Sequence, residues 1–208
     1  MALRFTALPA LLLALSAVGC SSHRVLVPPR LDLRQYGRLG LITFSAENAK
    51  GSLPQYATER FSEEILAAQP GIEVLELGSV DSLLERVGEK EPGIATAQEL
   101  GMQRDVGAVF AGRLKVSNPN ASGGLAGLLT PHLEATVRVE LTVRLVSTRS
   151  GATLWRSSAW ATEKVGQVAL VDGQLEFAAR DPKGAYGRLV NRLIGLVTQD
   201  LWSTWQKQ

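Results

Sequence analysis

One segment constrains the fold more than any other: the residues from Leu133 to Leu145 alternate strictly between apolar and polar side chains. Alternation with period two predicts a β-strand with one buried and one solvent-exposed face. At about 3.4 Å per residue this strand is roughly 44 Å long, well above the usual length. Thr148 to Gly151 then predict a turn, and Thr153 to Val165 predict the returning strand of a long β-hairpin.

The segments before the hairpin alternate between strand and helix patterns. Apolar runs predict strands at 38–44, 72–77 and 106–116, and helical periodicity predicts helices at 53–68, 80–87 and 94–100. Ser52 and Gln55 have the spacing of a capping box at the start of the first helix. The buried face of that helix is predicted to carry Leu53, Ala57, Phe61, Ile65 and Ala68, and its exposed face Glu59, Glu63 and Gln69.

The end of the chain predicts an amphipathic helix. Its apolar side chains recur at helical spacing: Tyr186, Leu189, Val190, Leu193, Val197, Leu201 and Trp205. Together these elements predict an α+β fold (an α/β sandwich) in which helices pack on a mixed sheet that contains the long hairpin. We expect a single domain over residues 37–208.

The first nineteen residues have the layout of a secretory signal peptide. Arg4 is followed by an apolar run, Phe5 to Leu15, that is too short to span a bilayer, and then by small residues. Cys20 follows directly and is the only cysteine of the chain. The letters "AVGC" resemble a bacterial lipobox, which implies cleavage before Cys20 and lipidation of its sulfur. The alternative is an ordinary secretory signal in which the cysteine stands at this place by chance.

The residues after Cys20 bear on sorting and reach. By resemblance to lipoproteins of Gram-negative bacteria, in which Asp after the cysteine retains the protein in the inner membrane, Ser21 implies the outer membrane. Residues 20–36 include Pro28 and Pro29 and show no sustained period, so we expect a lipidated N-terminus followed by a tether. A lone thiol forms neither an internal disulfide nor a multi-cysteine metal site. The covalent lipid is therefore the only attached group that we expect, with no cofactor and no metal.

The charges and motifs of the chain argue against several classes of function. The full chain has 22 basic and 20 acidic residues, and the signal peptide removes one of the basic ones, so we expect no nucleic-acid partner. The two histidines are His23, in the tether, and His132, at the start of the long strand, a separation that argues against an acid–base pair. No hydrolase, metalloprotease or phosphate-loop motif occurs. We therefore expect no enzyme.

Four arginines are expected along one strand face: Arg113, Arg138, Arg144 and Arg156. They form either a surface for a partner, with Arg138 and Arg144 as its candidate residues, or a salt-bridge ladder with Glu134 and Glu140. Trp202 and Trp205 are three residues apart, so on a helix they would lie side by side. They would then either cover a neighbouring protein or seal the core of the domain itself.

Two stretches resemble a known group of proteins. "AVFAGR" from Ala108 to Arg113 and "RLVSTRSGATLW" from Arg144 to Trp155 resemble segments of the periplasmic lipoproteins of the CsgG, LpoB and TolB-N-like group. The similarity extends over Arg38 to Val165 and marks no catalytic residue. It implies a lipoprotein that works by binding. One branch of the group forms an oligomeric secretion pore by inserting hairpins into the outer membrane, and an LpoB-like branch activates peptidoglycan synthases.

These observations lead to one functional hypothesis and one alternative. The hypothesis is a non-enzymatic, outer-membrane-anchored lipoprotein facing the periplasm, an interaction or assembly module of envelope biogenesis that binds an unidentified periplasmic or envelope protein. The alternative is a homo-oligomeric secretion or transport component, either a CsgG-like pore subunit or an auxiliary lipoprotein of an ABC transporter. The long strand bears on the choice, because a pore hairpin faces lipid whereas an ordinary sheet strand is covered by helices.

Overall fold

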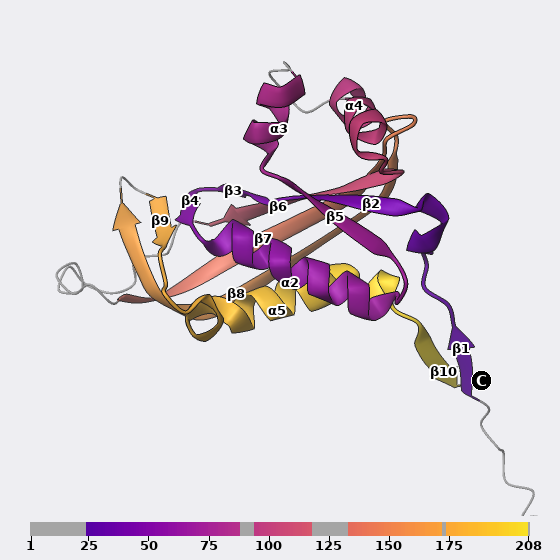
Figure 1. Cartoon of the computed structure of the whole chain (residues 1–208). Coiled ribbons are helices and arrows are strands. Elements are labelled where there is room, and N and C mark those ends of the chain that lie inside the picture. The colour runs from indigo at the N-terminus through magenta and orange to yellow at the C-terminus, as the bar shows by residue number, and fades with distance from the viewer. Residues whose placement is uncertain (1–23, 88–93, 118–132, 172–173, 208) are drawn as a thin grey trace, which may run out of the picture. The chain divides into compact units, whose positions relative to one another are not determined.

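The computed structural model describes residues 24–87, 94–117, 133–171 and 174–207. The part from Pro29 to Trp202 contains an eight-stranded mixed sheet with helices packed on it, so the predicted α+β fold is confirmed (Figure 1). Its strands are β2 (Arg38–Ile42), β3 (Ser45–Glu47), β4 (Ala49–Gly51), β5 (Glu73–Gly78), β6 (Ala108–Val116), β7 (Leu133–Ser147), β8 (Thr153–Val171) and β9 (Gln174–Phe177). Its helices are α2 (Leu53–Ala68), α3 (Val80–Val87), α4 (Ile94–Arg104) and α5 (Pro182–Thr198).

The long hairpin forms the centre of the sheet. β7 and β8 have 15 and 19 residues and pair antiparallel from Leu133↔Val168 to Val146↔Thr153. The strand order is β4-β9-β8-β7-β6-β2-β5. The predicted alternation is confirmed from Val137 to Leu145, where every second side chain is apolar and completely buried: Val137, Val139, Leu141, Val143 and Leu145. At the predicted turn, Gly151 has a φ of 69° and donates its N–H to Ser147 O at 2.8 Å.

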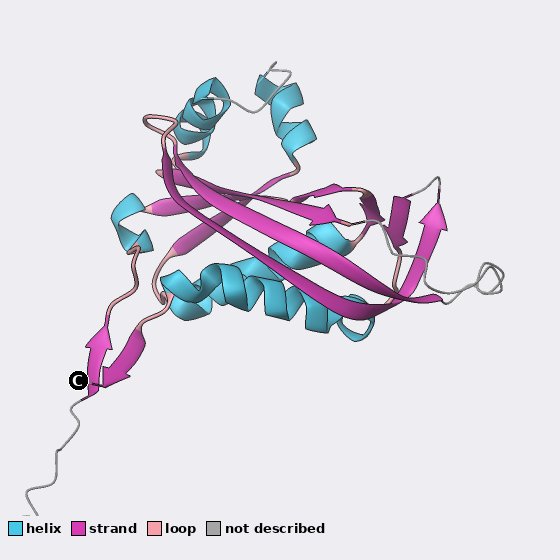
Figure 2. Cartoon of the chain, turned by 180° about the vertical axis from the view of Figure 1, so that it is seen from behind, coloured by secondary structure: helices cyan, strands magenta, loops and turns pink. Residues whose placement is uncertain are grey.

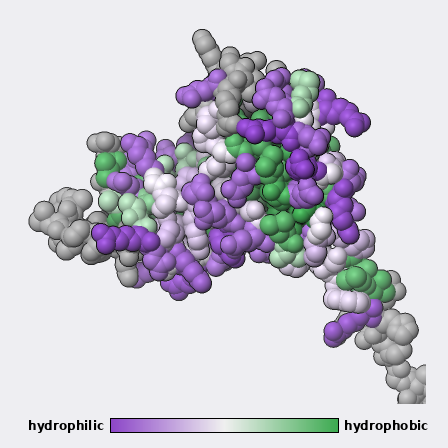
Figure 3. All heavy atoms as spheres, viewed as in Figure 1, coloured by the Kyte–Doolittle hydropathy of each residue, from purple (hydrophilic) through white to green (hydrophobic). Residues whose placement is uncertain are grey.

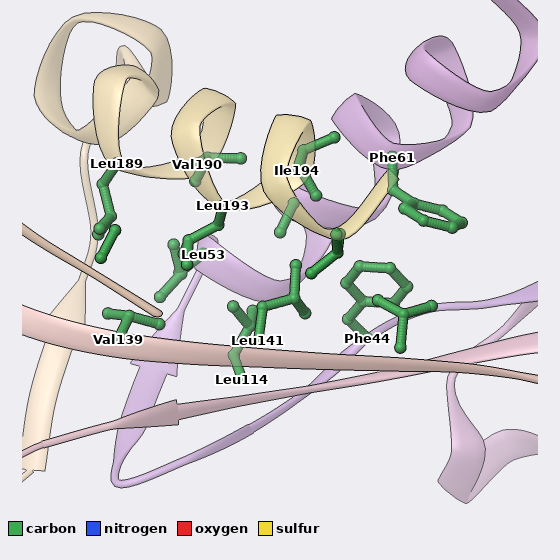
Figure 4. Packing of buried hydrophobic residues seen from close by; sticks show 14 of the residues in the cluster. Phe44, Leu53, Phe61, Leu114, Val139, Leu141, Leu189, Val190, Leu193 and Ile194 are labelled. Atoms are coloured by element: carbon green, nitrogen blue, oxygen red, sulfur yellow. The ribbon is translucent and has the colours of Figure 1, made fainter. Parts of the chain in front are cut away.

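Helices cover the sheet from both sides (Figures 1 and 2). α2 and α5 lie next to each other on one face, where Phe61, Leu141 and Leu193 belong to the main core (Figure 4). α3 and α4 lie over one end of the other face, where Leu83 and Leu100 form a smaller cluster with Val109. Among the helices in the described ranges, none is long and apolar enough to cross a membrane.

One end of the sheet closes on itself through two short strands that the sequence did not predict. β3 pairs with β6 and β4 pairs with β9. In the chain, only Asn48 separates β3 from β4. Asn48 turns the corner with a φ of 62°, a left-handed conformation that asparagine tolerates better than most residues. The enclosed space is filled with apolar side chains that are at most 4% exposed: Leu114, Val116, Val139, Leu175 and Phe177.

α2 begins at the predicted residue but without the predicted capping box. The Ser52 side chain makes no cap hydrogen bond. Its hydroxyl instead donates to Phe177 O at 3.0 Å and lies 2.6 Å from the hydroxyl of Tyr186. Because Ser52 uses its proton toward Phe177, Tyr186 is the donor of this second bond. Burial raises the pKa of the Tyr186 hydroxyl, partly opposed by the bond to Ser52, so the donor stays protonated.

The segment predicted as a tether contains regular structure. A 3₁₀-helix runs from Leu33 to Tyr36, and the Leu33 side chain is completely buried. Gln69, predicted to face solvent, is only 3% exposed. Its amide accepts from Leu33 N at 2.8 Å and donates to Leu31 O at 2.7 Å and Leu201 O at 3.1 Å. These three bonds hold residues 31–36 on the domain because they leave no polar atom of this amide unpaired.

The two ends of the described chain form a separate unit. β1 (Arg24–Val27) pairs antiparallel with β10 (Thr204–Lys207) in a two-stranded ribbon. The C-terminal helix was therefore predicted too long. It ends at Thr198, and a 3₁₀-turn, Gln199–Leu201, still buries Leu201 before the chain becomes extended. Helical spacing of apolar residues continued to Trp205 by coincidence, because backbone pairing with β1 determines the conformation there.

Candidate functional site: the open face of the sheet

The side of β6, β7 and β8 opposite α2 and α5 is only partly covered by the described helices, since α3 and α4 lie over one end of it (Figure 1). We call its exposed part the open face. Among its described side chains, six exposed basic residues stand against one carboxylate, Glu140, and a second at its border, Glu47, so this part of the surface is cationic. The six are Arg113, Lys115, Arg138, Arg144, Arg156 and Lys164.

Two arginines lie directly opposite each other at the centre of this surface. The register of the hairpin pairs Arg144 with Arg156, and Arg144 faces the small side chain of Ala111 on β6. Like charges opposite each other on a sheet destabilise it. Neither guanidinium forms a hydrogen bond or ion pair with any residue in the described ranges. Each can therefore offer its full planar set of donors to an acidic group from outside.

The next row of the hairpin is neutral. Thr142 and Ser158 are paired across the strands, and their hydroxyl oxygens lie 2.9 Å apart. On the β6 side of Thr142, Arg113 is bound by the carboxylate of Glu47, which also lies 3.8 Å from Lys115 Nζ. The predicted salt-bridge ladder is therefore wrong for Arg113, because its partner comes from the unpredicted strand β3 and not from β7.

Further along the strands, the open face carries an exposed aromatic ring. Trp160 is 58% exposed, and the guanidinium carbon of Arg138 lies 4.2 Å from the centre of its ring. A cation–π contact of this kind contributes about 0.5–1 kcal/mol at an exposed site. Trp160 was not among the predicted site residues, although a large aromatic residue at a strand position facing solvent was an available signal.

The residues that were predicted as a partner surface belong to three different segments of the chain. Arg138 and Arg144 share the open face, about 20 Å apart along β7. Trp202 follows the last 3₁₀-turn, is 37% exposed and donates its indole N–H to Glu64 Oε1 at 3.1 Å. Trp205 belongs to β10, so the two tryptophans do not share a helix face. Cys20 lies outside the described residues.

Other surfaces of the same unit are less suited to bind a charged ligand than the open face. An open groove of about 900 Å³ has mixed charge at its lining, and Arg38 in it already binds Glu73 at 3.2 Å and lies 3.9 Å from Asp105. In the ranges that the structure describes, no three His, Cys, Asp or Glu side chains gather as metal ligands would. Asp32 has a lowered pKa because its side chain accepts hydrogen bonds from Arg34, which is a local contact beside the 3₁₀-helix.

The paired arginines make a testable prediction about stability. Arg156→Glu places a carboxylate opposite Arg144, so the free energy of unfolding should rise by about 0.5–1 kcal/mol in low salt. Urea denaturation measures this, and the gain should shrink in about 1 M salt, which screens exposed charges. Arg156→Gln, which removes the repulsion without adding an attraction, should gain less. A loss of stability in Arg156→Glu would show that Arg144 and Arg156 do not repel each other.

No family model matches the chain, and no curated protein matches it. The chain is similar to a solved structure of the PelC dodecamer from Paraburkholderia phytofirmans, with 13% identity over 88% of this chain and 98% of that chain and a TM-score of 0.48. It is similar to lipoprotein GNA1162 from Neisseria meningitidis, with 17% identity over 62% of this chain and 83% of that chain and a TM-score of 0.39. It is also similar to the LpoB C-terminal domain from Salmonella enterica, with 13% identity over 74% of this chain and 94% of that chain and a TM-score of 0.39. Because each TM-score is below 0.5, we transfer no residue role, partner or activity from them. Of the three names in the predicted group, LpoB occurs among these similar structures. The resemblance to CsgG and to TolB-N stays a prediction.

Proposed function

We propose that this chain is a non-enzymatic lipoprotein of the bacterial envelope, anchored in the outer membrane through Cys20 with its domain in the periplasm, and that it binds an acidic surface of a partner protein on the open face. One observation carries the proposal: Arg144 and Arg156 lie opposite each other, exposed and without an acidic partner among the described residues. A free domain is destabilised by this arrangement, whereas a complex that supplies carboxylates gains two charge-assisted bonds.

The composition of the open face favours a protein surface as the ligand. Four of its six cations are arginines, whose planar donors match carboxylates in pairs. Trp160 beside Arg138 adds an aromatic anchor, and tryptophan and arginine are the residues that dominate binding energy at protein interfaces. A membrane surface would require several apolar side chains for insertion. Among the described side chains of β6–β8, the large apolar ones that are exposed are Trp160 and, at the end of β8, Val171.

The alternative of a pore subunit has less support. A lipid-facing hairpin needs a continuous apolar band that is free to contact lipid. From Val137 to Leu145 the apolar side of β7 is instead completely buried with α2 and α5 in the main core. No feature of the described residues favours an auxiliary lipoprotein of an ABC transporter over an interaction module.

In-cell photo-crosslinking tests the proposal. A photoreactive amino acid at Ser158, between the paired arginines and Trp160, should capture one discrete partner. Arg156→Glu should reduce the adduct at least about tenfold, because it replaces a charge-assisted bond by a repulsion. Arg188→Glu makes the same charge change on α5, on the other side of the sheet, and should leave the adduct unchanged.

The captured protein must then show complementary chemistry. An Asp→Arg or Glu→Arg change in its crosslinked region should restore the adduct with Arg156→Glu. If the adduct survives Arg156→Glu undiminished, or if Arg188→Glu weakens it equally, the open face is not the binding surface. Because Arg156→Glu is expected to stabilise the free domain, a lost adduct would not be explained by unfolding.

A further inference from the structure

The terminal ribbon of β1 and β10 exposes an apolar pair. The register places Leu26 opposite Trp205, and both are exposed, by 49% and 66%. Cross-strand partners project from the same face of a ribbon. Arg24, two residues before Leu26, shares that face, and Lys207 is its register partner. The ribbon thus has one face on which an aliphatic and an aromatic side chain lie next to a basic position.

Such a pair is unusual at the surface. Large apolar side chains that lie together on a strand pair are normally covered by a second layer, and a two-stranded ribbon alone has marginal stability in water. Val25, on the opposite face, is also 40% exposed. No other described side chain of the ribbon covers Leu26 and Trp205. Contact with an apolar environment outside the protein would therefore stabilise the ribbon.

The sequence places a bilayer within reach. Only Ser21, Ser22 and His23 separate Cys20 from Arg24. Four residue steps span at most about 14 Å when fully extended. The interfacial region of one leaflet is about 5–8 Å thick, so a lipid on Cys20 would hold the start of the ribbon at or next to the headgroups.

We infer that the terminal ribbon lies flat on the membrane, with Leu26 and Trp205 inserted at the headgroup level. This inference rests on the lipid anchor of the proposed function. Tryptophan is enriched at this depth because its ring is apolar and its N–H remains hydrogen-bonded. Arg24 and its register partner Lys207 are both basic residues, and basic residues are attracted to anionic lipid headgroups. The ribbon therefore joins both chain ends to the bilayer, and Trp205 acts as a lipid contact and not as part of a partner surface.

The lone cysteine allows a direct test that does not depend on acylation in the cell. Purified protein of residues 20–208 is coupled through Cys20 to a maleimide phospholipid in vesicles of phosphatidylcholine and phosphatidylglycerol. Lipids brominated in the acyl chain near the headgroup then quench any tryptophan that inserts. We expect quenching in the unsubstituted protein, the same quenching in Trp202→Phe, and loss of most of it in Trp205→Phe.

Each outcome decides the inference. Equal quenching in Trp205→Phe and Trp202→Phe, or none in any variant, would overturn it. Quenching that appears only at high protein density would also overturn it, because the ribbon would then be covered by a second copy of the chain. Acyl labelling of Cys20 in cells is a separate readout: its absence would reject the proposed anchor, whereas quenching of maleimide-anchored protein reports only on the ribbon.

Discussion

Phe61→Ala is expected to lower the free energy of unfolding by about 3–5 kcal/mol. Phe61 is completely buried on α2, and its ring centre lies 5.3 Å from that of Phe44 and 5.1 Å from that of Phe110 (Figure 4). Removal of the ring therefore loses apolar burial and leaves a cavity between α2 and the sheet. Such a loss is a large fraction of the total stability of a typical domain.

Urea denaturation followed by tryptophan fluorescence measures this effect. Trp155 is a suitable reporter, because its ring centre lies 6.1 Å from that of Phe110 and its indole nitrogen is buried. Leu66→Ala is the matched control: Leu66 lies on the same helix but is 42% exposed, so it should cost less than about 1 kcal/mol. Equal losses in the two variants would mean that α2 does not pack on the sheet through Phe61.

Cys20→Ser is expected to release the protein from the membrane. Lipid chains stabilise attachment by about 0.8 kcal/mol per buried methylene, so their removal abolishes an anchor that is otherwise nearly permanent. Labelling with a radioactive or clickable fatty acid should disappear, and the protein should move from the membrane fraction to the soluble periplasm. The ribbon that we infer to lie on the membrane contributes two inserted side chains, which do not replace acyl chains.

A substitution of the neighbouring residue provides the control. Ser21→Asp leaves the thiol intact, so acyl labelling should persist while the protein stays in the inner membrane, as in the lipoproteins that this segment resembles. Membrane retention of Cys20→Ser at the wild-type level would show that another element anchors the chain.

Part of the surface of the protein is apolar. Figure 3 shows apolar side chains gathered near the middle of one side of the molecule, amid a mostly polar surface. Val74 and Leu75 of β5, an edge strand, are half-buried between Glu73 and Glu76. Charged residues on an edge strand discourage pairing with another chain, which is consistent with the open face as the binding surface.

Several elements could be predicted from the sequence because the relevant signal lies in consecutive residues. Alternation in β7 correctly predicted which side chains are buried, and α3 begins and ends at the predicted residues. The strands β3, β4 and β9 have three or four residues each, too few for a period to appear. Gln69 was assigned to the wrong side because helical spacing does not show which distant backbone groups need a partner.

The residues of the candidate site could also be predicted only in part. Arg138 and Arg144 could be assigned to the exposed face of a strand from alternation alone. The sequence did not predict that Arg156 lies opposite Arg144, because that depends on the register between two strands and on the bulge between Leu145 and Val146. Trp160 became significant only when the structure placed Arg138 over its ring.

By itself, the sequence determined the fold class, the buried faces of β7 and α2, and the presence of a single cysteine behind an apolar segment. These properties follow from local periodicity and composition. Only the tertiary structure decided that β1 pairs with β10, that β4 pairs with β9, and that Trp205 lies opposite Leu26. The physical reason is that strand pairing satisfies backbone groups of segments far apart in the chain, and no pattern of consecutive residues encodes the choice of partner.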